Sequence, residues 1–235
     1  MEIIRKSWNQ DDYGEFRKYL KGLLEESYKK FNEKIIPDTP LFYGIRVPKL
    51  REISKEILKG NSQEFINLKK EEYHEEIIIE GLVMAGESKD YEEMLEYMKA
   101  FSEKIYNWAI CDTVSFKGVK KYKREFLKDS VWFYENENPW IVRFGLKNLM
   151  DFYLDEGYIK EVLEITKSVK SDFYYVEMMQ AWLLATAFAK FRKETLTVLE
   201  KGGFSQNVYN MTVRKIRDSF RISKEDKEMI LKFKR

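Results

Sequence analysis

The chain of 235 residues carries 42 Lys and Arg against 40 Asp and Glu, with a single His and a single Cys. One Cys excludes an internal disulfide, and one His with one Cys argues against a zinc site or a His-centred catalytic triad. Because the net charge is only +2, binding to a polyanion would require a local basic face and not a basic protein as a whole.

Helical periodicity runs through almost the whole chain, and only four prolines and eleven glycines interrupt it. Phe16, Leu20, Leu23, Leu24 and Tyr28 follow the spacing of one helix face, so residues 12–36 are predicted to form one long helix. Further helices are expected over residues 50–58, 77–84, 94–101, 108–116, 122–133, 141–153, 159–169, 174–191, 195–199, 208–216 and 224–233.

Short connections between these helices indicate antiparallel helical pairs. Pairs of about 35–45 residues stacked in series form an α-solenoid of the HEAT-like or armadillo type. No crisp motif repeats at a fixed period, so a compact irregular helical domain is the alternative. No change in composition marks a linker, and we predict an all-α solenoid that forms a single domain over residues 1–235.

Targeting and membrane signals are not evident in the sequence. Residues 1–13 contain no apolar run of signal-peptide length, and the apolar stretch 181–189 is far shorter than a membrane span. We therefore expect a soluble, cytoplasmic protein that does not enter a membrane.

The segment 107–112, Asn-Trp-Ala-Ile-Cys-Asp, is the most unusual local feature. On a helix, Trp108 and Asp112 lie one turn apart and share a face. An aromatic ring beside a carboxylate suits a developing positive charge. The alternative is a packed tryptophan with a solvated or capping aspartate.

His74 lies among Glu71, Glu72, Glu75 and Glu76, which predicts a solvated helix face and not a ligand set.

Basic residues are unevenly distributed. Arg143 follows Pro139 near a predicted helix start. A positive charge there is repelled by the helix dipole, so an anion such as a phosphate beside Arg143 would be stabilising. Trp182 lies among small residues, which suggests close helix packing. Three basic clusters cover residues 117–124, 190–193 and 214–224. Gathered on a concave face, they could hold a duplex through its phosphates. The alternative is ordinary solvated helix faces.

Three stretches resemble the DNA alkylation repair family, the AlkD-like DNA glycosylases with HEAT-like repeats. Residues 42–51, FYGIRVPKLR, resemble the family's GVRxPxLR segment, and Trp108 to Asp112 resemble its WDxxD segment. Trp140 to Arg143, followed by Trp182, have the family's order and approximate separations. The resemblance runs from about residue 26 to the C-terminus.

The resemblance implies roles for particular residues. Asp112 would be the catalytic carboxylate against the deoxyribose, and Trp108 and Trp182 the aromatic walls on that sugar. Arg143 would grip the DNA backbone. The other expected DNA contacts are Arg46, Lys120, Lys121, Lys190, Arg214 and Arg217. No metal or other cofactor is expected, and the family is thought to act without inserting the base into a pocket.

The sequence also departs from the family pattern. Ala109 replaces an acid and Ala185 an arginine that is frequent in active members. The single helix expected over residues 12–36 resembles a branch that lacks a second, lesion-contacting N-terminal helix. We expect a monomeric DNA glycosylase that excises purines alkylated at N3 or N7 from double-stranded DNA. The alternatives are a non-catalytic protein that binds damaged or distorted DNA, and a helical scaffold for protein interactions.

Overall fold

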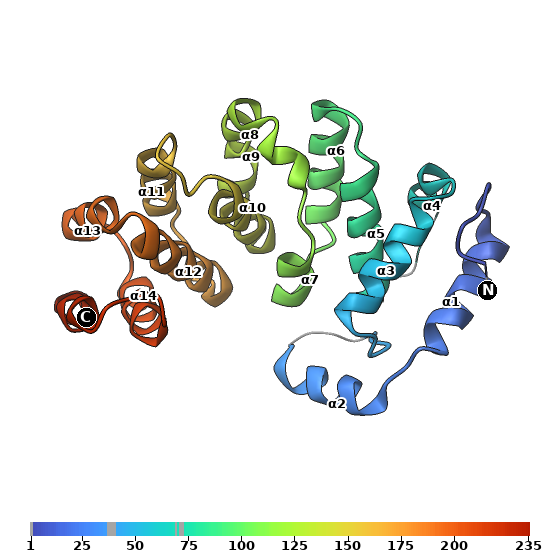
Figure 1. Cartoon of the computed structure of the whole chain (residues 1–235), viewed down its shortest axis with the longest axis horizontal. Helices are drawn as coiled ribbons and strands as arrows, with labels where there is room; N and C mark the ends of the chain where they lie inside the picture. Colours follow the sequence, from blue (N-terminus) through green and yellow to red (C-terminus); the bar gives the residue numbers. More distant parts are fainter. Residues whose placement is uncertain (1, 37–40, 69, 71–72) are drawn as a thin grey trace. The chain divides into compact units, whose positions relative to one another are not determined.

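The computed structural model describes residues 2–36, 41–68, 70 and 73–235. Every secondary-structure element in these residues is a helix (Figure 1), which confirms the all-α prediction. None of these helices is long and apolar enough to cross a bilayer. The chain divides into two compact units, Met1–Tyr122 and Lys123–Arg235. The single domain expected over residues 1–235 stays a prediction.

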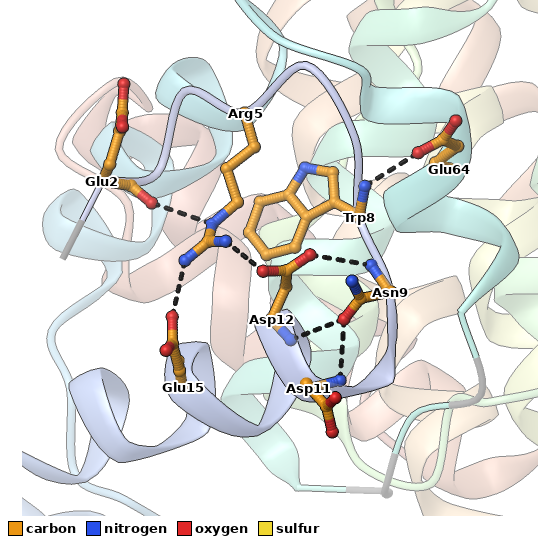
Figure 2. A network of polar contacts seen from close by, with 8 residues as sticks. All are labelled: Glu2, Arg5, Trp8, Asn9, Asp11, Asp12, Glu15 and Glu64. Atoms are coloured by element: carbon orange, nitrogen blue, oxygen red, sulfur yellow. Dashed lines mark hydrogen bonds and ion pairs between the residues drawn. The ribbon is translucent and has the colours of Figure 1, made fainter.

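An N-terminal segment fastens the first unit's opening helix, α1 (Gln10–Lys21), to α4 (Ser62–Asn67). Asn9 and Asp12 form a capping box at the start of α1 (Figure 2). Arg5 pairs with the same Asp12 carboxylate. The backbone N–H of Trp8 donates to Glu64 on α4 at 2.8 Å, so the segment bridges two helices that are distant in sequence.

The predicted single helix over residues 12–36 is wrong. It is two helices, α1 and α2 (Glu26–Ile35), separated by residues 22–25. The buried face of α1 ends at Leu20, and the N–H of Gly22 closes the last turn by donating to the carbonyl of Lys18 at 3.1 Å. Leu24 is exposed, so the apolar spacing beyond Leu20 does not mark a continuing buried face.

Helix α5 (His74–Glu87) is the central helix of the first unit. It packs against α3 (Val47–Ile57), α4, α6 (Tyr91–Ser102) and α7 (Trp108–Thr113). Most of its residues are buried, including three glutamates. The short 3₁₀ helix η1 (Lys117–Lys120) follows α7.

Two buried carboxylates of α5 hold the backbone that leads into α3. Glu75 accepts hydrogen bonds from the N–H groups of Tyr43, Gly44 and Ile45 at 2.9, 2.6 and 3.0 Å. Glu76 accepts from the Tyr43 hydroxyl at 2.7 Å. Burial raises the pKa of both carboxyl groups. These bonds satisfy groups that would otherwise be costly to bury.

The second unit begins with α8 (Lys123–Asp129) and α9 (Val131–Tyr134), where one helix over residues 122–133 was predicted. The longer helices α10 (Pro139–Phe152), α12 (Tyr174–Lys190) and α14 (Gln206–Asp218) pack in series. Helices α11 (Ile159–Ser168) and α13 (Arg192–Lys201) pack on each other. The unit ends with α15 (Lys224–Met229) and the 3₁₀ helix η2 (Ile230–Phe233). These two layers of helical pairs are the arrangement of an α-solenoid.

Candidate nucleic-acid interface

Trp108 and Asp112 lie one turn apart on α7, as the sequence predicts. Asn107 caps this helix, because its side-chain oxygen accepts from the N–H of Ile110 at 3.0 Å. The indole Nε1 of Trp108 donates to the carbonyl of Ile35 at 3.3 Å, which ties α7 to the end of α2. Both Trp108 and Asp112 are half-buried.

Trp108 and Asp112 share one pocket of about 220 Å³, which we call the Asp112 pocket. Helices α2, α3, α5 and α7 and the segment around Phe42 enclose it. Its lining residues are Tyr28, Asn32, Ile36, Phe42, Ile45, Val47, Leu50, Arg51, His74, Ile78, Trp108, Ala109, Asp112 and Thr113. The carboxylate therefore stands beside a mainly apolar space with a few polar groups, which is typical of a ligand site.

His74, the first residue of α5, is 4% exposed and lines the Asp112 pocket. Its ring lies against Phe42, with centroids 4.9 Å apart. Burial lowers the pKa of His74 to about 4, so the imidazole is neutral at neutral pH. The expected solvated helix face is wrong here, because Glu75 and Glu76 are buried with it. Glu71 and Glu72 lie outside the described residues.

In the second unit, Trp182 of α12 lines a hollow of about 320 Å³ beside the end of α14. Its side chain is 39% exposed, and the ammonium of Lys215 lies 5.9 Å from the indole centroid. Ala185 and Ala189 also line the hollow, and Arg221 adds a second positive charge to it. An accessible ring beside cations suits a nucleic acid, whose bases stack and whose phosphates pair.

Arg143 does not lie on the surface. It is 2% exposed on α10, and its Nη1 donates to the carbonyl of Tyr175 at 2.7 Å. The ring of Tyr175 in turn stacks on Trp140, with centroids 5.0 Å apart. This arrangement fixes the start of α12 against α10. The predicted grip on a DNA phosphate would require Arg143 to leave this position.

The other predicted DNA contacts are exposed side chains. The guanidinium of Arg46 is paired with Glu25, with 2.9 Å between Nε and Oε2, and lies 4.7 Å from the Tyr28 ring centroid. Lys120 and Lys121 lie at the end of η1 in the first unit. Three more are exposed on α12 and α14 of the second unit, namely Lys190, Arg214 and Arg217.

Tyr28 and Arg51 are among the residues of the Asp112 pocket that sequence reasoning did not assign to the site. Arg51 lies one helical turn after Val47, so the FYGIRVPKLR motif itself contained the signal. Tyr28 was assigned to the buried face of a long helix. Its place beside Asp112 depends on the break before α2, which that assignment did not include.

A family model of DNA alkylation repair enzymes matches residues 15–173, more than half of the chain. The matched region includes Trp108, Asp112 and Arg143 and ends before Trp182. No curated protein and no solved structure matches the chain significantly. The length and position of the family match show that the chain belongs to the DNA alkylation repair enzyme family.

Proposed function

We propose that the protein is a DNA glycosylase that hydrolyses the N-glycosidic bond of purines carrying a cationic N3 or N7 alkyl group. The family gives the chain a role in DNA repair. The observation that carries the finer proposal is the Asp112 carboxylate, half-buried beside Trp108 in a pocket of about 220 Å³.

The chemistry needs a group that stabilises positive charge on the sugar. When the bond from C1′ to the purine nitrogen breaks, its electron pair leaves with the base. The cationic base becomes neutral, and C1′ is left as an oxocarbenium ion. A water then adds to C1′ and loses a proton. A carboxylate stabilises the cation and can orient the water and accept its proton, as in glycoside hydrolysis.

Aromatic rings supply the second part of this stabilisation. The face of a tryptophan attracts a nearby cation, and the attraction grows when water is excluded. Trp108 lines the same pocket as Asp112 and can supply this ring. The role of Trp182 as a second aromatic wall stays a prediction. The alkylated base is already a good leaving group, so the step calls for no protonation of the base.

The test is single-turnover release of 3-methyladenine or 7-methylguanine from a methylated duplex. Asp112→Asn should slow release by about 100-fold or more, because it removes the anion and keeps the shape. Asp11→Asn is the matched control, since this exposed aspartate lies in the first turn of α1. Release that is equally fast in Asp112→Asn would refute the proposed role of the carboxylate.

A second candidate is a protein of the same family that binds damaged or distorted double-stranded DNA without excision. Ala109 and Ala185, which stand where the family pattern has an acid and an arginine, favour it. Membership of the branch that lacks a second, lesion-contacting N-terminal helix stays a prediction, because the single helix on which it rested is two helices, α1 and α2. This candidate predicts binding that weakens steeply with salt, with no free base released from the methylated duplex.

A further inference from the structure

The turn between α14 and α15 carries the most exposed large apolar side chain of the described residues. Phe220 is fully exposed, at 104%, whereas the other exposed large apolar side chains are 38–58% exposed. We call residues 219–223 the Phe220 turn. A single exposed ring is common on protein surfaces, so its surroundings decide what it can bind.

Local hydrogen bonds hold the Phe220 turn, so the ring projects from an ordered backbone. The hydroxyl of Ser219 accepts from the N–H of Arg221 at 3.2 Å. The hydroxyl of Ser223 caps α15 by accepting from the N–H of Asp226 at 3.1 Å. An aromatic side chain with two rotatable bonds on an ordered turn loses little conformational entropy when it binds a partner.

Two arginines flank the ring. Arg221 follows Phe220 directly and Arg217 precedes it by three residues, and both side chains are exposed. Within the part of the chain that the structure describes, neither guanidinium is held in an ion pair, so both can meet a phosphate. The carboxylate of Asp218 lies 3.9 Å from Nε of Arg214, one turn earlier on α14.

The Phe220 turn borders the hollow lined by Trp182, which we call the Trp182 hollow. Ser219 and Arg221, the residues on either side of Phe220, both line it. Lys215 lies there as well, over the indole ring. Two accessible aromatic rings and several cations therefore belong to one surface of the second unit. This combination favours a nucleic acid over a protein partner, because rings stack on bases and cations pair with phosphates.

We propose that Phe220 stacks on an unpaired base of distorted double-stranded DNA, while Arg217 and Arg221 pair with phosphates beside that base. A paired base is covered on both faces by its neighbours, whereas an unpaired base can leave the stack and offer a face. The base stays on the protein surface, outside any pocket, which agrees with the mode that the family resemblance implies. Because every base has a flat face, this contact recognises the distortion and not the sequence.

The inference rests on the DNA binding that is common to both candidate functions, and not on excision by Asp112. Its test therefore uses two unmethylated duplexes that differ by one bulged nucleotide, with affinities of the full chain measured by fluorescence anisotropy. Wild type should prefer the bulged duplex. Phe220→Ala should weaken binding to the bulged duplex about 5- to 150-fold, which is the contribution of one stacked base, and leave binding to the paired duplex unchanged.

Phe31→Ala is the matched control, because Phe31 on α2 is the next most exposed large apolar side chain. It should keep the preference for the bulged duplex. Phe220→Trp should also keep it, since tryptophan stacks on bases. Phe220→Leu retains an apolar side chain without an aromatic face and should lose the preference. Because the Phe220 side chain makes no buried contact, each of its variants should unfold at the same urea concentration as wild type.

Arg221→Ala tests the phosphate contact separately. It should weaken binding to both duplexes and reduce the slope of log K against log salt by about one. Equal affinity of the wild type for the two duplexes, or an unchanged preference in Phe220→Ala, would overturn the proposal and leave the ring to a protein partner. A Phe220→Leu protein with the wild-type preference would overturn stacking. Neither duplex is methylated, so a failure of excision changes none of these results.

Discussion

His74 lies at the start of α5, and its burial determines how the protein responds to mild acid. Burial lowers its pKa to about 4 in the folded state, from the ordinary histidine pKa of 6.5, which applies to the unfolded chain. Between these values the unfolded state binds the proton and the folded state does not. The stability associated with a neutral His74 is therefore complete above about pH 6.5 and is lost as the pH falls toward 4.

We expect this loss to reach about 3 kcal/mol, from a shift of this size at 1.36 kcal/mol per pKa unit. The measurement is the free energy of unfolding in urea from pH 7 to pH 4, for wild type and for His74→Asn. Asparagine keeps a polar group near Asn107 but does not titrate. Carboxylates titrate in both proteins, so the difference isolates the histidine. Parallel curves for the two proteins would contradict the prediction.

Arg143 provides a second prediction at the residue scale, because its position separates a structural role from a DNA contact. Its guanidinium binds the Tyr175 carbonyl inside the second unit. Arg143→Met should lower the free energy of unfolding by about 1–3 kcal/mol, since a buried acceptor loses its donor. The salt dependence of DNA binding should stay unchanged.

The matched comparison is Arg217→Ala, which changes an exposed arginine of α14. It should leave the stability within about 0.5 kcal/mol and reduce the salt slope by about one. Both quantities come from urea unfolding and from binding isotherms at several salt concentrations. A reduced slope in a stable Arg143→Met protein would restore Arg143 as the predicted phosphate contact.

At the scale of elements, α2 depends on a short clamp. The backbone of Gly44 has φ +86°, and a Cβ there would lie 2.7 Å from Cβ of Lys29 on α2. The Gly44 carbonyl accepts from the N–H of Glu25 just before α2, at 3.3 Å, and Glu75 binds the Gly44 N–H. One glycine therefore joins α2 to the buried carboxylate of α5.

Gly44→Ala should destabilise the protein by about 1–3 kcal/mol, because alanine is strained at positive φ and meets Lys29. Amide hydrogen exchange should show the largest loss of protection in α2. Gly14→Ala is the control, since a Cβ at Gly14 in α1 meets nothing within 4 Å. It should stabilise α1 by up to about 1 kcal/mol. Unchanged protection of α2 in Gly44→Ala would show that the clamp does not hold this helix.

The same elements show how far sequence reasoning reaches. The spacing of Trp108 and Asp112 placed both on one helix face, because that relation is local to α7. The break at Gly22 was missed, since the apolar spacing continues through Leu23 and Leu24 without being buried. The Asp112 pocket could not be predicted, because its walls come from four helices brought together by packing.

Buried charge is the other part of the fold that local patterns hide. The glutamates around His74 have the composition of a solvated face, yet Glu75 and Glu76 are bound by backbone N–H groups and tyrosine hydroxyls from residues 30 or more positions away. A sequence shows the charge of such a residue and not its partners. The same holds for Arg143, whose partner Tyr175 lies 32 residues further along the chain.

At the scale of the whole molecule, a net charge of +2 gives no long-range attraction to DNA. Binding must therefore depend on where the cations lie. In the second unit, Lys190 is the last residue of α12, Arg217 lies in α14, and Arg221 lies in the turn after α14 and lines the Trp182 hollow. Lys160, Lys193 and Lys201 line a different hollow, between α11 and α13. The two sets carry equal charge on different layers of the same unit.

Replacing either set by alanine lowers the net charge by the same amount, so the comparison isolates the position of the charges. We expect the Lys190/Arg217/Arg221 triple variant to reduce the slope of log K against log salt by about two to three, at about 0.9 per phosphate contact. The Lys160/Lys193/Lys201 variant should keep the wild-type slope.

An equal reduction of the slope in both variants would mean that DNA binding depends only on the net charge. A larger reduction in the Lys160/Lys193/Lys201 variant would place the DNA on α11 and α13. Because the cations of α14 and its following turn lie beyond residue 173, where the family match ends, the first outcome would also show that DNA binding extends past the matched region.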